Sequence, residues 1–329
     1  MKYRFTLKQN IVYYVSKRLN VFHVLHRIPK RKEGISVMMR VKNEEEWIGL
    51  SLRSLSCFAD EVIIVDNAST DNTLKEIEKV RPNVPFKLIV KKDDSRDICK
   101  VSNRALSLTS YNWIERWDAD FIAFTSGERN IIHLRKYLLS LKKKNYYQVY
   151  PILINFSYDL SHVHKNHILH SEGYIHTYHP SAKYKKRGVF EFLRVPLFFL
   201  VKRVYTVHFV HTGTSKCIEK LLYRYYWLVW IKDSRTKEPN GIIKYIRKTA
   251  KKEWDTEDLG QIIREIFNEQ RPFLQKYEKD KYVEYPELLQ SKIVNPKYKI
   301  LYKNDKPYMR NDMVDFNEES INKNGILYQ

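Results

Sequence analysis

Two aspartates that are one residue apart, Asp118 and Asp120, are the side chains of this sequence best suited to chemistry. They follow a short apolar segment, and another apolar segment, residues 62–65, also ends in an aspartate, Asp66. Carboxylate oxygens are the hard ligands that Mg²⁺ and Mn²⁺ prefer, and such a metal neutralises the charge of a diphosphate. Asp-x-Asp pairs are common on protein surfaces, so this prediction depends on the elements that carry the pair.

Strands and helices alternate regularly around these aspartates. Helices are predicted between the strands, the first with Asn43 as its N-cap and the third over residues 98–110. The strands are predicted at residues 35–41, 61–65, 86–90 and 112–117. This alternation predicts a parallel sheet with right-handed crossovers. Ligands bind at the carboxyl ends of such strands, which is where Asp66 and Asp118 are expected.

Four motifs in this order resemble the family 2 glycosyltransferases of the GT-A fold. They are VKNEE (41–45), VDNASTDNT (65–73), NRAL (103–106) and WDAD (117–120). The resemblance covers roughly residues 34–230, and it is closest to a subgroup that adds sugars to lipopolysaccharide cores and similar surface glycans. Residues 188–191 and 211–213 match that subgroup more loosely. Phe121 departs from it, because the subgroup often has a further acid there.

The resemblance implies an α/β protein: a GT-A (Rossmann-like), mostly parallel sheet flanked by helices. We expect a basic amphipathic N-terminal segment at residues 1–33, a catalytic domain at 34–230 and a mainly helical C-terminal extension at 231–329. Residues 220–230, rich in aromatic and basic side chains, are predicted to form a helix.

The resemblance also implies a role for each matched residue. Glu44 and Asp66 would contact the ribose and the base of a nucleotide sugar, and Asp97 and Asn103 would line the same pocket. Asp118, Asp120 and His211 would hold Mn²⁺ or Mg²⁺, with Asp118 also near the ribose or diphosphate of the donor. The residue types alone leave structural roles open, such as an acid in a first helical turn or a capping Asp.

An inverting transfer needs a base that accepts the proton of the acceptor hydroxyl. Glu191 is our candidate because Phe190 and Phe192 flank it, and burial raises the pKa of a carboxyl group toward working pH. An edge strand with Glu191 facing water is the alternative reading. Glu172 and Asp159 are the second choices.

The net charge of +21 predicts polyanionic partners. Residues 1–32 contain nine Lys or Arg and no acid, and apolar side chains recur at helical spacing at Val12, Val15, Leu19 and Phe22. Such a helix can lie on an anionic membrane, or it can pack on the catalytic domain. We therefore expect a cytoplasmic protein, or a peripheral one on the inner face of a membrane.

Other patterns exclude several classes of protein. The three cysteines are far apart, which fits packed thiols in a reducing compartment. We find no P-loop motif, no secretory signal and no apolar run of the ~18 residues that span a bilayer. Six histidines between residues 162 and 179 lack the cysteines or the His-Glu-x-x-His pattern of zinc sites, so we expect them in acceptor-site or solvent-exposed loops.

These patterns predict a metal-dependent glycosyltransferase with a nucleoside-diphosphate sugar as donor, a UDP-sugar first. The expected acceptor is a surface glycan or a lipid-linked saccharide. Two alternatives stay open: transfer to a nucleic-acid base, which the charge permits, and a non-catalytic basic binding module on the same fold.

Overall fold

A computed structural model describes residues 5–25, 29–95, 97–187, 190–212, 241–296, 299–304 and 306–309. The chain divides into two compact units. The first unit comprises residues 1–154, 169–211 and 279–289, and the second comprises residues 155–168, 212–278 and 290–329. The three regions expected from the sequence stay a prediction.

Four parallel strands form the centre of the first unit. In pairing order they are β4 (Tyr111–Arg116), β1 (Lys32–Val41), β2 (Glu61–Asp66) and β3 (Lys87–Lys92). Every residue of β2 and most of β1 are buried, since elements cover both faces of the sheet. The predicted strands and their parallel order are confirmed. Val41 pairs with Asp66, so β1 and β2 end side by side.

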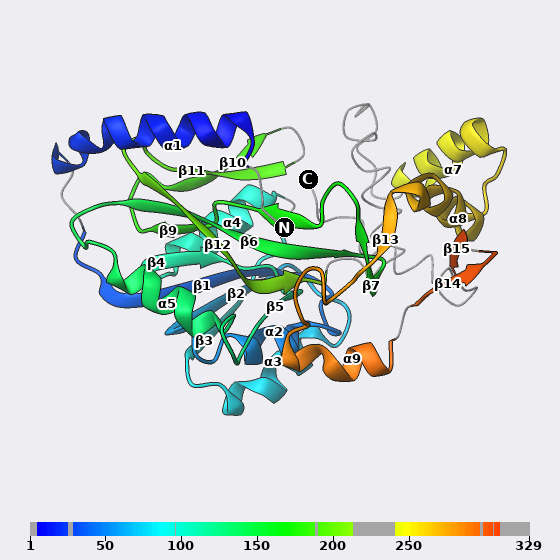
Figure 1. Ribbon diagram of the computed structural model, residues 1–329, viewed down its shortest axis with the longest axis horizontal. Helices are drawn as coiled ribbons and strands as arrows, with labels where there is room; N and C mark the ends of the chain where they lie inside the picture. Colours follow the sequence, from blue (N-terminus) through cyan, green and yellow to red (C-terminus); the bar gives the residue numbers. More distant parts are fainter. Residues whose placement is uncertain are drawn as a thin grey trace. The chain divides into compact units, whose positions relative to one another are not determined.

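Successive residues of a strand point to opposite faces of the sheet. Val37 and Met39 of β1 belong to the core that also contains α2 (Ile48–Ser54), α3 (Thr73–Val80) and α5 (Ile131–Ser140). Met38 of β1 and Ile63 of β2 pack instead with α4 (Ile98–Ser107). Helices therefore cover both faces of the parallel strands (Figure 1), and the predicted α/β class is confirmed.

The first predicted helix begins later than expected. α2 starts at Ile48, and Asn43 is not its N-cap. Asn43 has a φ of 51°, in the left-handed region, so the chain does not enter a helix there. Its side-chain oxygen accepts a hydrogen bond of 2.8 Å from the backbone N–H of Thr70, which ties the loop after β1 to the loop after β2.

Antiparallel strands extend the sheet. β9 (Ile175–Thr177) pairs with β4 and with β6 (Tyr147–Ser157), and β8 (Leu169–Ser171) also pairs with β6. β5 (Phe121–Ala123) pairs with the long strand β12 (Leu200–His211), so that Phe121 lies opposite His211. Among the described residues, β10 (Lys183–Arg187) and β11 (Phe190–Arg194) pair only with each other.

The basic N-terminal segment contains a helix, as predicted. α1 (Leu7–Leu19) begins with a capping box formed by Thr6 and Gln9, and the short 3₁₀ helix η1 (Asn20–Leu25) follows it. α1 packs on β12: Ser16 is buried and its hydroxyl accepts from the backbone N–H of Val201 at 3.3 Å. The guanidinium group of Arg203 donates to Asn10 at 2.8 Å.

The second unit is described by itself. It contains α7 (Gly241–Trp254), α8 (Leu259–Gln270) and α9 (Gln290–Val294). β7 (Asp159–His164) pairs with β13 (Leu274–Lys276), and β14 (Ile300–Lys303) pairs with β15 (Lys306–Met309). The helix predicted at residues 220–230 lies outside the described residues. Over the described ranges, we find no helix of the length and apolarity needed to cross a membrane.

Candidate functional site

Glu44 and Asp66 lie at the ends of the neighbouring strands β1 and β2, as predicted. Asp66 is buried, and both of its carboxylate oxygens lie 3.4 Å from the backbone N–H of Ser69. Glu44 is also buried, and its backbone N–H donates to the hydroxyl of Thr73 at 2.6 Å. Lys42 lies close to Asp66: burial lowers the pKa of its ammonium group to about 8, and the charge of Asp66 opposes that shift. A cation thus accompanies the acid of β2.

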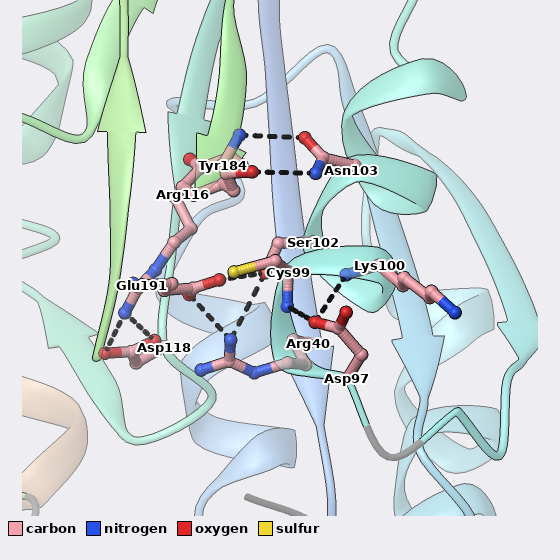
Figure 2. A network of polar contacts seen from close by, with 10 residues as sticks. All are labelled: Arg40, Asp97, Cys99, Lys100, Ser102, Asn103, Arg116, Asp118, Tyr184 and Glu191. Atoms are coloured by element: carbon pink, nitrogen blue, oxygen red, sulfur yellow. Dashed lines mark hydrogen bonds and ion pairs between the residues drawn. The ribbon is translucent and has the colours of Figure 1, made fainter. Parts of the chain in front are cut away.

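Asp97 and Asn103 both form hydrogen bonds with backbone groups of the protein. Asp97 caps α4, since its Oδ1 accepts from the backbone N–H groups of Cys99 at 2.8 Å and Lys100 at 3.3 Å. The side-chain amide of Asn103 exchanges two hydrogen bonds with the backbone of Tyr184 on β10, at 2.9 and 2.8 Å (Figure 2). Asn103 therefore joins the β10–β11 hairpin to α4. The predicted contact of both residues with a nucleotide stays a prediction.

Asp118 and Asp120 have different partners. Both oxygens of Asp118 accept from Nη2 of Arg116, at 2.6 and 2.8 Å. Burial alone would raise the pKa of Asp118, but the charges of Arg116, Arg40 and His211 together outweigh burial and hold this pKa below its ordinary value. Asp120 is buried, and its Oδ2 lies 3.3 Å from Nε2 of His211.

The pairing of β5 with β12 explains why His211 lies beside Asp120, although 90 residues separate them in sequence. Two of the three predicted metal ligands are thus in contact, while Asp118 is turned toward Arg116. In the part of the chain that the structure describes, no three His, Cys, Asp or Glu side chains are arranged to hold a metal ion. The set of three metal ligands stays a prediction. Asp118 would have to turn away from Arg116 to join Asp120 and His211.

Glu191 lies at the centre of a polar network between β1, α4, β4 and β11 (Figure 2). Its Oε1 accepts from Nη1 of Arg40 at 2.6 Å and from Nη1 of Arg116 at 2.9 Å, and its Oε2 accepts from the hydroxyl of Ser102 at 2.6 Å. The carboxylate is buried, but it is surrounded by charged donors rather than by the phenyl rings expected from its sequence neighbours. It faces neither water nor an apolar pocket.

Arg116 connects Glu191 to Asp118. Its guanidinium carbon lies 3.8 Å from the ring centroid of Tyr174, which fixes its plane. Burial lowers the pKa of Arg116, but Asp118 and the neighbouring acids raise it well above its ordinary value, so this side chain stays charged. Burial raises the pKa of the preceding Glu115 well above its ordinary value, which favours a neutral carboxyl group there.

Sequence reasoning missed Arg40, Ser102 and Arg116. A signal was present for the two arginines, since Arg40 interrupts the apolar run of β1 and Arg116 ends β4 directly before Trp117, and buried arginines are usually paired. No sequence pattern indicates the partner, because Glu191 is 151 residues from Arg40 and 75 residues from Arg116.

The second-choice bases have other partners. Glu172 accepts from Nε2 of His170 at 2.8 Å. Asp159, in the second unit, is buried and contacts Nδ1 of His162 at 2.7 Å, while Nε2 of His162 contacts the hydroxyl of Tyr302 at 2.7 Å. The six histidines are divided between the two units: His162, His164 and His167 belong to the second, and His170, His176 and His179 to the first. The described part of the chain contains no zinc ligand set among them.

Comparisons with known proteins agree with this picture. Residues 36–191 match the family model described as Glycosyl transferase family 2. Poly-beta-1,6-N-acetyl-D-glucosamine synthase of Staphylococcus aureus is 30% identical over 93 residues, which are 27% of this chain and 22% of that protein. The chain therefore covers about a fifth of the length of this relative.

Solved structures of low sequence identity also resemble the chain. TarS 1–349 of S. aureus in complex with UDP-GlcNAc is 15% identical with a TM-score of 0.38, over 73% of this chain and 73% of that chain. The mannosyltransferase PcManGT from Pyrobaculum calidifontis in complex with GDP-Man and Mn²⁺ is 12% identical with a TM-score of 0.40, over 88% of this chain and 93% of that chain.

The family match begins within β1 and ends at Glu191, so it includes every acidic strand end described above and the centre of the polar network. The family expected from the sequence motifs is confirmed over this range: residues 36–191 match the model of glycosyl transferase family 2.

Proposed function

We propose that this protein is a glycosyltransferase that moves a sugar from a nucleoside-diphosphate sugar to a hydroxyl group of a surface glycan or a lipid-linked saccharide. The main support is the position of Glu44, Asp66 and Asp118 at the carboxyl ends of adjacent parallel strands within a family 2 domain. The similarity of 93 residues to poly-beta-1,6-N-acetyl-D-glucosamine synthase supports a glycan as acceptor.

Glu44 and Asp66 are proposed to bind the nucleoside of the donor. A carboxylate accepts hydrogen bonds from ribose hydroxyls or from a base N–H, and both residues lie at one edge of the sheet. A UDP-sugar is the first donor to test. Lys42, beside Asp66, prevents the two acids from presenting an uncompensated negative charge to a dianionic ligand.

Asp118, Asp120 and His211 are proposed to hold Mn²⁺ or Mg²⁺. Oxygen and imidazole ligands suit these ions, and Asp120 and His211 are already in contact. The ion, when bound, would neutralise charge that develops on the leaving diphosphate. Asp118 must turn at least one oxygen from Arg116 to join this set, and its exposed edge gives room for that movement.

The proton of the acceptor hydroxyl must be transferred if the reaction inverts the anomeric carbon. Glu191 stays the predicted base from the sequence, but it would have to give up a contact with Arg40, Arg116 or Ser102 to accept a proton. Those contacts favour a second role for Glu191, as a counter-ion, and the two roles predict different effects of substitution.

An anionic membrane is the proposed partner of α1 and η1. Eight of the fifteen exposed large apolar side chains of the described chain lie in these two helices: Leu7, Ile11, Val12, Tyr14, Val15, Val21, Phe22 and Val24. Lys8, Lys17 and Arg18 accompany them. Apolar side chains beside lysines and arginines are typical of a helix that lies in the interface of an anionic bilayer.

The proposed activity is tested by thermal melting with UDP-, GDP-, CMP- and dTDP-sugars in the presence of Mn²⁺, followed by donor hydrolysis and transfer assays. A ligand that binds only the native state raises the melting temperature. We expect one donor to raise it for the wild type and not for Asp66→Asn. Asp280→Asn, an exposed acid of the segment 279–289 of the first unit, is the control. A protein that no nucleotide stabilises, yet that binds DNA or glycan, would instead be a binding module.

A further inference from the structure

Arg40 is a charged residue at a position where its neighbours are fully buried and apolar. It is the next-to-last residue of β1, between Met39 and Val41, and it retains 20% side-chain exposure. Its side chain points to the sheet face of Met38, toward α4, where it meets Ser102. Burying most of a guanidinium group is unfavourable unless its donors have partners.

Only one of the three nitrogens of this guanidinium group has partners among the described residues. Nη1 donates to Glu191 at 2.6 Å and to Ser102 at 3.2 Å. Nε and Nη2 donate to none of the residues described. Glu191 and Ser102 thus fix the plane of the group from one side, while the N–H groups on its other side remain available.

The available N–H groups lie at the ligand-binding edge of the sheet. Arg40 pairs with Val65, one residue before Asp66. Its charge also contributes to the lowered pKa of Asp118, so the two side chains are close enough to interact. Figure 2 shows Arg40 and Asp118 at the same end of the network, with Glu191 contacting Arg40 and, through Arg116, connected to Asp118.

We propose that Arg40 binds an oxygen of the donor's diphosphate, and that Glu191 and Ser102 are positioning residues that hold its guanidinium group for this contact. The inference rests on the proposed function, because it places the diphosphate of that donor at the sheet edge. Asp66, Asp118, Asp120 and Glu191 would repel a diphosphate, so cations must offset them. A fixed guanidinium fork binds phosphate oxygens in a bidentate manner, which an ammonium group does not.

The test compares a nucleoside with its diphosphate. Isothermal titration calorimetry measures binding of UDP and of uridine to the wild type, Arg40→Gln and Arg40→Lys, each in EDTA and in Mn²⁺. If UDP does not bind, the diphosphate of the donor identified by melting is used with its nucleoside. Arg53→Gln removes one exposed positive charge of α2 and serves as the matched control.

We expect Arg40→Gln to weaken diphosphate binding by about tenfold or more in EDTA and to leave nucleoside binding unchanged. Arg40→Lys should recover only part of the loss, and Ser102→Ala should show a smaller loss. If Arg40→Gln does not fold, as judged by its melting curve, Arg40→Lys decides alone. Diphosphate binding equal to that of the wild type in the folded variant overturns the inference. A wild type that binds no nucleotide at all refutes the proposed function itself.

Discussion

The side chains of Glu191 and Arg116 form an ion pair of 2.9 Å in which the carboxylate is only 3% exposed and the guanidinium group 9%. The pair joins β11 to β4, two strands that do not pair with each other in the described part of the sheet. Leaving one member of a buried pair without its partner destabilises a protein by about 3–5 kcal/mol. Removing the charge of Glu191 would leave Arg40 without its carboxylate partner, while Arg116 would keep only Asp118.

Glu191→Gln separates the two roles of this residue. If Glu191 is a counter-ion, the substitution should lower the free energy of unfolding by about 3 kcal/mol or more and weaken diphosphate binding. If Glu191 is a general base, the substitution should lower kcat by a factor of about 10² and leave donor binding and stability unchanged. We expect the first pattern, measured by urea denaturation, calorimetry and initial rates. Glu78→Gln, which breaks an exposed contact with Arg81, is the control.

Asp120→Asn and His211→Gln should abolish the rise in melting temperature that Mn²⁺ adds to a nucleoside diphosphate. Both side chains are proposed ligands and touch each other at 3.3 Å. Their melting temperatures without metal should change little. Asp118→Asn should lose the metal effect and also melt lower, because Arg116 loses the partner of its Nη2. Direct titration of Mn²⁺ by electron paramagnetic resonance gives a readout that is independent of turnover, and normal affinity in all three variants would show that the ligands lie elsewhere.

His176 should make the protein sensitive to acid. This imidazole is fully buried on β9, and burial lowers its pKa to about 4 from an ordinary value of 6.5. The unfolded chain therefore binds a proton below pH 6.5 that the folded chain does not. The contribution to stability is complete above pH 6.5 and is lost, by about 1.4 kcal/mol per pH unit, as the pH falls toward 4.

The measurement for His176 is the difference in the free energy of unfolding between the wild type and His176→Leu at pH 7, 6 and 5. The carboxylates are the same in both proteins, so their contributions to the pH dependence cancel in this difference. Parallel pH curves for the two proteins would mean that His176 is protonated or solvated in the native state.

Polar substitutions on the exposed side of α1 should weaken membrane binding without loss of fold. Leu7 and Ile11 are 76% and 54% exposed, and each fully buried apolar side chain contributes about 1.5–3 kcal/mol. We expect Leu7→Ser with Ile11→Ser to lower the affinity for vesicles of phosphatidylserine and phosphatidylcholine by about tenfold or more. Val294→Ser, 73% exposed in the second unit, is the control. Equal binding of both variants would exclude α1 as the docking surface. Binding to DNA but not to vesicles would identify a nucleic acid as the polyanion.

The sequence predicted the framework of the site because that framework is local. β2 ends in Asp66 and β4 ends two residues before Asp118, and both strands can be recognised from a few neighbouring residues; parallel pairing then brings their ends together. The helix α1 was also predictable from its spacing. Its packing was not, since Val12, Val15 and Phe22 are exposed, while Ser16 makes the buried contact with β12.

The surroundings of Glu191 could not be predicted from its neighbours for a geometric reason. Adjacent residues of a strand point to opposite faces, so an aromatic neighbour such as Phe192 lies away from the carboxylate. Phe192 is indeed exposed, while Glu191 is buried among donors from β1, α4 and β4. Only the tertiary structure determines which distant residues face it.

The strand β12 carries both the contacts of α1 and the histidine beside Asp120. Val201 and Arg203, near the beginning of β12, contact α1, and His211 is the last residue of β12. The eight steps from Arg203 to His211 span roughly 26 Å at the ordinary rise of an extended strand. With α1 docked on a bilayer, β12 would set the distance between the lipid surface and the reacting centre. Selection among acceptors would then depend on how far each reaches from the membrane, in addition to its chemistry.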